Sequence, residues 1–103
     1  SDTVVMEKDG EVQVRRIIAA AGDEVNLAEE GLEINGYLQQ ESGIYTETLP
    51  YTEGISFPIT LEENEYFVLG DNRSEAKDSR IYGVVKKEEI KGTVITLLRH
   101  RGF

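Results

Sequence analysis

The chain has 103 residues, 39% of them hydrophobic, and it carries 20 acidic against 11 basic side chains, a formal net charge of −9. This length favours one domain with a modest core, and the acidic balance argues against a nucleic-acid binder, which needs a basic surface. The sequence contains no Cys and a single His. That composition excludes disulfide scaffolds and thiol nucleophiles, and it disfavours a His-based triad or metal site. We expect no cofactor and no metal.

The N-terminal fifth of the chain is typical of a β-hairpin. Residues 3–6 form a short β-branched run, and Asp9-Gly10 is a strong turn dipeptide. From residue 11 onward apolar and polar side chains alternate, as in a half-buried strand. We therefore expect strands at 3–6 and 11–21 joined by a tight turn.

A second hairpin is predicted around Asn35-Gly36, the strongest short hairpin signal in the chain. Alternating residues 24–27 precede it. Residues 39–54 are polar and are interpreted as a long connection. Strand character resumes at 57–61, where Pro58 implies an edge or the start of a strand.

Buried-strand character is strongest at residues 66–69, a dense apolar run. We expect a further strand at 81–85, a single helical turn at 86–90 and a last strand at 93–98. The many short strands predict an all-β fold, a sandwich or a partly open barrel of coiled sheets with at most one short helical turn. The whole chain, residues 1–103, is predicted to form one domain.

The most informative stretch, residues 70–80, follows the buried strand directly and is here called the signature loop. All eleven residues are polar, small or charged. Composition alone favours a self-bonded surface loop, because charged turns are common. Arg73 and Arg80 can each fork onto an acid, and Asp71 and Asp78 are the nearest partners.

A second informative stretch places two adjacent arginines, Arg15 and Arg16, in an otherwise apolar strand. Successive strand side chains face opposite ways, so one arginine should point to the buried face or to a cleft. A buried Arg must find an acid or carbonyl groups, since it keeps its proton. For Arg16 a structural ion pair is the favoured interpretation.

Together the two stretches resemble one family, the type I signal peptidases, membrane-bound serine proteases that cut leader peptides from exported proteins. The family's loop has the form Gly-Asp-Asn-Arg-x-x-Ser-x-Asp-Ser-Arg, and its strand the form Val-Lys-Arg-Val-Ile-Gly-Leu-Pro-Gly-Asp. The residues that match the loop are Gly70, Asp71, Asn72, Arg73, Asp78, Ser79 and Arg80. Those that match the strand are Val14, Arg16, Ile18, Gly22 and Asp23. Residues 2–6, 32–36 and 66–70 also suit the family, so the resemblance covers essentially the whole chain.

The resemblance implies a Ser/Lys dyad, in which a serine attacks the scissile carbonyl and a lysine acts as general base. Burial must lower the pKa of that lysine so that neutral amine is present, and a serine of the signature loop orients it. The implied location is the extracytoplasmic side of the cell membrane. The implied partners are exported proteins or their leader peptides in extended conformation, and a membrane surface reached through an N-terminal anchor.

Three departures from the family pattern converge on this dyad. The nucleophile belongs to a Ser-Met-x-Pro segment upstream of the first strand, and we expect that segment and the anchor to lie outside this chain. Arg15 stands at the base position, and an arginine cannot act as a base near neutrality. Ala76 stands at the position of the orienting serine. We hypothesise that Glu75 pairs with Arg15, so that a structural ion pair replaces the dyad.

The resemblance also assigns the remaining candidate site residues. Asp78 and Arg80 accompany Arg15 and Ala76 at the catalytic position. The structural residues of the loop are Gly70, Asp71, Asn72, Arg73 and Ser79. An extended peptide could pair with the edge of either strand that lines the groove. The expected binding residues are Val4, Val5, Met6, Val14, Arg16 and Ile17.

Three functions remain open on the sequence. The first is the soluble part of a signal peptidase with an unusual arginine, whose full-length parent cleaves leader peptides. The second is a non-catalytic paralogue that binds exported proteins or assists the assembly of surface pili, which explains why the lysine and the loop serine are lost together. The third does not depend on the resemblance: the chain is a small acidic β-domain that binds a partner by strand addition.

Overall fold

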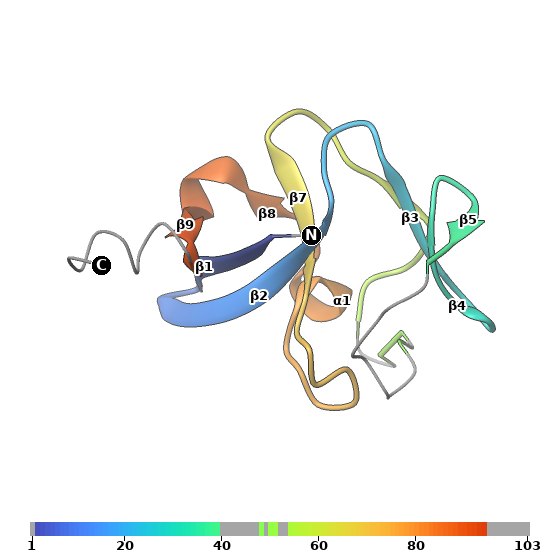
Figure 1. Ribbon diagram of the computed structural model, residues 1–103, viewed down its shortest axis with the longest axis horizontal. Helices are drawn as coiled ribbons and strands as arrows, with labels where there is room; N and C mark the ends of the chain where they lie inside the picture. The colour runs from blue at the N-terminus through green and yellow to red at the C-terminus, as the bar shows by residue number, and fades with distance from the viewer. Residues whose placement is uncertain (1, 40–47, 49, 52–53, 95–103) are drawn as a thin grey trace.

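A computed structural model describes residues 2–39, 48, 50–51 and 54–94 (Figure 1). The strands form two antiparallel sheets, one of five strands in the order β8-β7-β2-β1-β9 and one of four in the order β5-β4-β3-β6. The all-β prediction is confirmed, with short helical elements between strands. The elements are β1 Thr3–Lys8, β2 Glu11–Ala19, β3 Glu24–Ala28, β4 Gly31–Ile34, β5 Tyr37–Leu38, β6 Ile59–Thr60, β7 Glu65–Leu69, α1 Ser79–Tyr82, β8 Val85–Lys86, the 3₁₀ turn η1 Lys87–Glu89 and β9 Ile90–Thr93.

Both predicted hairpin turns are present. Asp9 and Gly10 have φ angles of 53° and 79°, and Asn35 and Gly36 have 54° and 84°. Two central residues with positive φ make the mirror-image turn whose twist matches that of antiparallel strands, and Asn, Asp and Gly adopt it most readily. These turns set the register, in which Val4 lies opposite Arg15.

Strand β7 lies at the centre of the packing and contributes to two apolar clusters. Phe67 and Leu69 join the larger cluster, together with residues of β2, β3 and β4, while Val68 faces the opposite way into the smaller one. Because neighbouring side chains of a strand point to opposite faces, residues 67–69 of β7 must be apolar on both faces. The predicted buried strand is confirmed. The clusters are, first, Ala19, Val25, Leu32, Leu61, Phe67 and Leu69, and second, Met6, Val68 and Val85.

The prediction of a strand over 81–85 is wrong for most of its length, because a helical turn, α1, occupies Ser79–Tyr82. The Asp78 side chain accepts the Arg80 N–H at 3.1 Å, a helix N-cap, and Gly83 ends the turn with φ 78°. Only then does β8 begin, at Val85.

The C-terminal elements agree in part with the predictions. The helical turn expected at 86–90 is confirmed as η1. Strand β9 ends at Thr93, so it lies earlier in the chain than the predicted 93–98, of which 95–98 fall outside the described residues.

Around the long connection only part of the chain is described. Of residues 39–54, positions 40–47, 49 and 52–53 lie outside the described residues, so the prediction made for this connection stays a prediction there. Strand β6, which follows Pro58, is the edge of its sheet, as the proline predicted.

Candidate functional site

The signature loop leaves β7 at Gly70, runs below the five-stranded sheet in Figure 1 and returns into α1. Its two ends are joined by hydrogen bonds. The Gly70 N–H donates to Asp78 Oδ2 at 2.9 Å, and the Val68 N–H donates to Ser79 Oγ at 2.9 Å. Polar side chains at the returning end therefore satisfy backbone donors at the end of the buried strand.

The C-terminal end of the signature loop contains a fully buried ion pair. Arg80 donates from Nε to Asp78 Oδ1 at 2.9 Å and from Nη2 to Asp78 Oδ2 at 2.8 Å, and both side chains are 0% exposed. Arg80 Nη1 also donates to the Arg73 carbonyl at 2.7 Å, and the guanidinium lies 4.4 Å from the centre of the Tyr51 ring. The predicted pairing of Arg80 with Asp78 is confirmed.

The predicted pairing of Arg73 with Asp71 is wrong. Arg73 turns inward, where Nε donates to the Gly70 carbonyl at 2.7 Å and Nη1 donates to Thr48 Oγ1 at 2.6 Å. Asp71 points outward to Arg16, with bonds of 3.0 and 2.9 Å. This pairing lowers the pKa of Asp71 and raises that of Arg16, since each hydrogen bond favours the charged form. The ion pair expected for Arg16 is confirmed.

Arg15 and the signature loop meet at Gly70. Arg15 Nε donates to the Lys77 carbonyl at 3.0 Å, and Nη1 donates to the Val14 carbonyl at 2.7 Å. A Cβ built on Gly70 would lie 2.3 Å from the Ala76 Cβ and 3.5 Å from Arg15 Cδ. Arg15 and Ala76, which the family resemblance assigns to the positions of the lysine and the loop serine, are therefore neighbours of one glycine.

The hypothesised pair between Arg15 and Glu75 is wrong. Glu75 Oε2 accepts a hydrogen bond from Asn72 Nδ2 at 3.2 Å, within the loop. Arg15 finds two backbone carbonyls instead, the other kind of partner that suits a charged guanidinium.

A family model described as signal peptidase, peptidase S26, matches residues 2–98. The chain belongs to this family. A crystal structure of a signal peptidase I from Enterococcus faecalis superimposes with a TM-score of 0.74 and 27% identity, covering 90% of this chain and 92% of that one. The matched region contains both stretches whose meeting at Gly70 is described above.

Curated signal peptidases show the same likeness. Signal peptidase I P of Bacillus subtilis subsp. natto is 37% identical over 87 residues, 78% of this chain and 47% of that protein. Signal peptidase I S of Bacillus subtilis strain 168 is 34% identical over 100 residues, 89% of this chain and 54% of that protein. Probable signal peptidase I-2 of Synechocystis is 34% identical over 79 residues, 77% of this chain and 34% of that protein. The chain thus spans between a third and about half of the length of these relatives.

The predicted peptide-binding residues differ in whether a peptide could reach them. Val4 and Met6 are fully buried, and β1 pairs with β2 on one side and with β9 on the other at Val4, Val5 and Met6. Pairing of a peptide with the β1 edge therefore does not fit the structure. Ile17 is also engaged, because it lies between β1 and β7.

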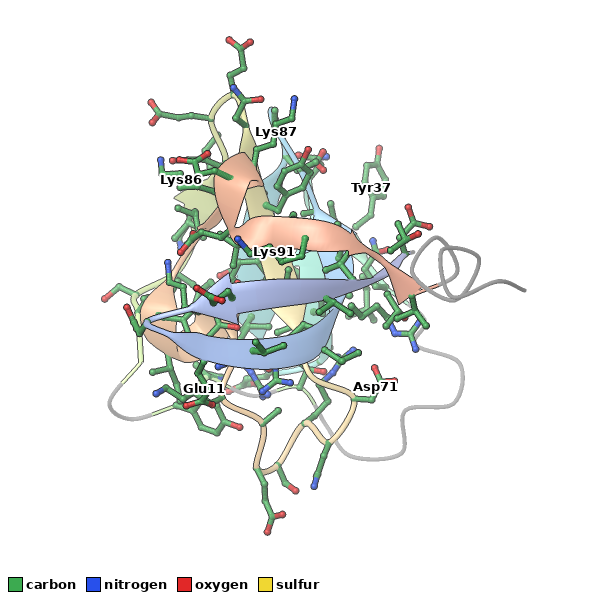
Figure 2. All side chains as sticks on the ribbon, turned by 90° about the vertical axis from the view of Figure 1, so that its left-hand side faces the viewer. Glu11, Tyr37, Asp71, Lys86, Lys87 and Lys91 are labelled. Atoms are coloured by element: carbon green, nitrogen blue, oxygen red, sulfur yellow. The ribbon has the colours of Figure 1, made fainter. Side chains whose placement is uncertain are left out.

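The edge of β2 is different, because β7 pairs with β2 only from Arg16 onward. In Figure 2 the strands β9, β1 and β2 follow one another, and the part of the loop that carries Asp71 lies beyond β2. A small pocket of about 90 Å³ opens here, and Val14 is 52% exposed. The pocket is lined by Thr3, Val14, Arg15, Arg16 and Asp71.

Two contacts of the site have no counterpart in the sequence predictions. The Tyr51 hydroxyl donates towards the Ala76 carbonyl at 2.7 Å and lies 3.2 Å from the Arg73 carbonyl. The Tyr82 hydroxyl donates to Gln13 Oε1 at 3.0 Å, and burial raises the pKa of Tyr82 to about 12. The sequence gives no signal for Tyr51, since its hydrogen-bond partners are backbone carbonyls. Gln13 could have been found, because the alternation in β2 puts it on the same face as Arg15.

No helix within the described part of the chain has the length and apolar character to cross a bilayer.

Proposed function

We propose that this chain is the extracytoplasmic domain of a membrane-anchored signal peptidase homologue that holds leader peptides in extended form without cleaving them by Ser/Lys chemistry. The observation that carries the proposal is the contact of Arg15 with the Lys77 carbonyl, beside Gly70 and Ala76. The family resemblance puts the general base at this place.

The chemistry of the guanidinium supports this conclusion. A general base must be able to stand neutral near the working pH, and an arginine side chain retains its proton in proteins. Arg15 also donates to two backbone carbonyls, so its N–H groups are engaged as donors at this place. Ala76 has only a methyl group in its side chain, so it cannot orient an amine.

Leader-peptide cleavage by the full-length protein tests the proposal. We expect a fluorogenic peptide with a small-residue Ala-x-Ala site to bind without being cleaved, at neutral and at alkaline pH. Cleavage by the unaltered protein would overturn the proposal.

A rescue experiment addresses the two departures directly. We expect cleavage only when Arg15→Lys and Ala76→Ser are combined in the full-length protein, because a lysine base needs both a lowered pKa and an orienting partner. Each single substitution serves as the control for the pair. A role in pilus assembly stays a prediction, as no contact described above favours it.

A further inference from the structure

Among the residues that the structure describes, no strand pairs with the outer edge of β2 before Arg16, so this edge is open there. The Ile17 N–H donates to the Asp2 carbonyl at 2.8 Å, so Ile17 directs its backbone groups towards β1. In an antiparallel pair the backbone N–H and C=O groups of successive residues point to opposite edges of the strand. The register between β1 and β2 has no shift from Thr3 to Lys8. Val12 and Val14 therefore direct their N–H and C=O groups away from β1, beyond the point where β7 stops pairing.

One of these outward groups is already occupied. Arg15 Nη1 donates to the Val14 carbonyl at 2.7 Å while Arg15 Nε donates to the Lys77 carbonyl at 3.0 Å. The guanidinium thus bridges the strand edge and the signature loop. An incoming strand that pairs at this edge would need the Val14 carbonyl as an acceptor.

We propose that Arg15 closes the open edge of β2, so that an extended peptide can pair at Val14 only after the guanidinium has left its carbonyl. The proposal depends on the proposed function only for the identity of the incoming strand, a leader peptide. The side chains at the edge would otherwise admit a partner, because Val12 and Val14 are 66% and 52% exposed. A charged side chain is a common device against unwanted pairing at a free edge.

The shape of the arginine side chain matters for this closure. A guanidinium presents several N–H donors in a rigid plane and can serve two carbonyls at once. An ammonium group is a compact point charge on a flexible stem, so a lysine at position 15 would hold the edge less firmly.

Peptide binding to Arg15→Met tests the closure, because methionine keeps an unbranched apolar stem beside Gly70 and removes every donor. The probes are two fluorescein-labelled ten-residue peptides, one with an Ala-x-Ala leader site and one unrelated β-forming sequence. We expect the leader peptide to bind the variant about tenfold more tightly than the unaltered chain, since one charge-assisted hydrogen bond no longer competes. Arg15→Lys should give a smaller gain and serves if the methionine variant does not fold.

Lys91→Ala is the matched control, because Lys91 is an exposed cation on β9 of the same sheet, away from the β2 edge (Figure 2). Its affinity for either peptide should equal that of the unaltered chain. Sedimentation of the peptide-free Arg15→Met variant gives an independent measurement, as a newly open edge should pair with a second copy.

The outcomes separate the closure from the leader-peptide function. A gain for the unrelated peptide alone, or dimerisation alone, supports the closure and contradicts the leader-peptide function. If neither peptide gains affinity and the variant stays monomeric, the closure is overturned. An equal gain in Lys91→Ala would also overturn it, because the effect would then be one of net charge.

Discussion

Two arginine–aspartate pairs involve the signature loop, and they lie in opposite environments. Arg80 and Asp78 are both 0% exposed, whereas Arg16 and Asp71 have 34% and 57% of their side chains exposed. Each pair has two hydrogen bonds of about the same length. Similar geometry therefore does not mean similar energy. A surface pair contributes about 0–1 kcal/mol, while removing one partner of a buried pair costs about 3–5 kcal/mol.

The difference follows from what else each aspartate holds. Asp78 also accepts the backbone N–H groups of Gly70 and Arg80, so it joins the end of β7 to the start of α1. Asp71 bonds to Arg16 from the outer side of the loop. The buried pair therefore fixes the backbone of the loop, whereas the exposed pair joins two side chains at the surface.

The largest effect is expected for Asp78→Asn, which removes the charge opposite the buried guanidinium and turns an acceptor into a donor. We expect the free energy of unfolding in urea to fall by about 3–5 kcal/mol. Asp71→Asn is the matched control, with the same chemical change on the exposed pair. Equal losses in the two variants would contradict the comparison.

A smaller loss is expected for Gly70→Ala, because the new Cβ would lie 2.3 Å from the Ala76 Cβ. Overpacking of this kind costs about 1–3 kcal/mol. Combining it with Ala76→Gly removes the contact atom and should restore most of the loss in a thermodynamic cycle. Strictly additive effects would mean that the loop does not approach Gly70 as described.

Tyr51→Phe should cost about 1 kcal/mol, because it removes the hydroxyl bonded to the Ala76 carbonyl and keeps the ring beside Arg80. Tyr37→Phe is the control, since Tyr37 is 75% exposed. Chemical denaturation measures both. A loss as large as that of Asp78→Asn would make Tyr51, rather than the buried pair, the main support of the loop.

The smallest effect is expected for Asp71→Asn, about 0.5 kcal/mol at neutral pH and less in high salt. Arg16 lowers the pKa of Asp71 in the folded chain, so the contribution is complete above the unfolded pKa of about 4 and is lost as pH falls through the lower folded value. Urea titrations at several pH values should show the difference between variant and unaltered chain vanish in acid. A difference that persists at pH 2 would point to a cause other than the ion pair.

The local parts of the fold could be predicted from the sequence. The turns at Asp9-Gly10 and Asn35-Gly36 depend on residues that adopt positive φ, and β7 on a continuous apolar run. Helix α1 cannot be recognised from the sequence, because its N-cap, Asp78, precedes a stretch whose apolar residues also suit a strand. Four residues contain too little periodicity to separate the two.

The site was predictable where partners are close in sequence. Asp78 and Arg80 are two residues apart, whereas Arg16 and Asp71 are separated by 55 positions, so nearness in sequence favours Arg73 as the partner of Asp71 and misses Arg16. The partners of Arg15 are backbone carbonyls, which every residue has, so nothing in the sequence identifies them. The motif placed Arg15 near the loop, but the bonds it makes there come from the tertiary structure.

The inward turn of two loop arginines has a consequence for limited proteolysis. Trypsin needs an accessible Lys or Arg side chain on a segment that can enter its active site. Arg73 and Arg80 are 1% and 0% exposed, while Lys77 between them is exposed. A stretch with three potential tryptic sites therefore offers the protease one in the native chain, and cutting after Arg73 or Arg80 would report that the loop has opened.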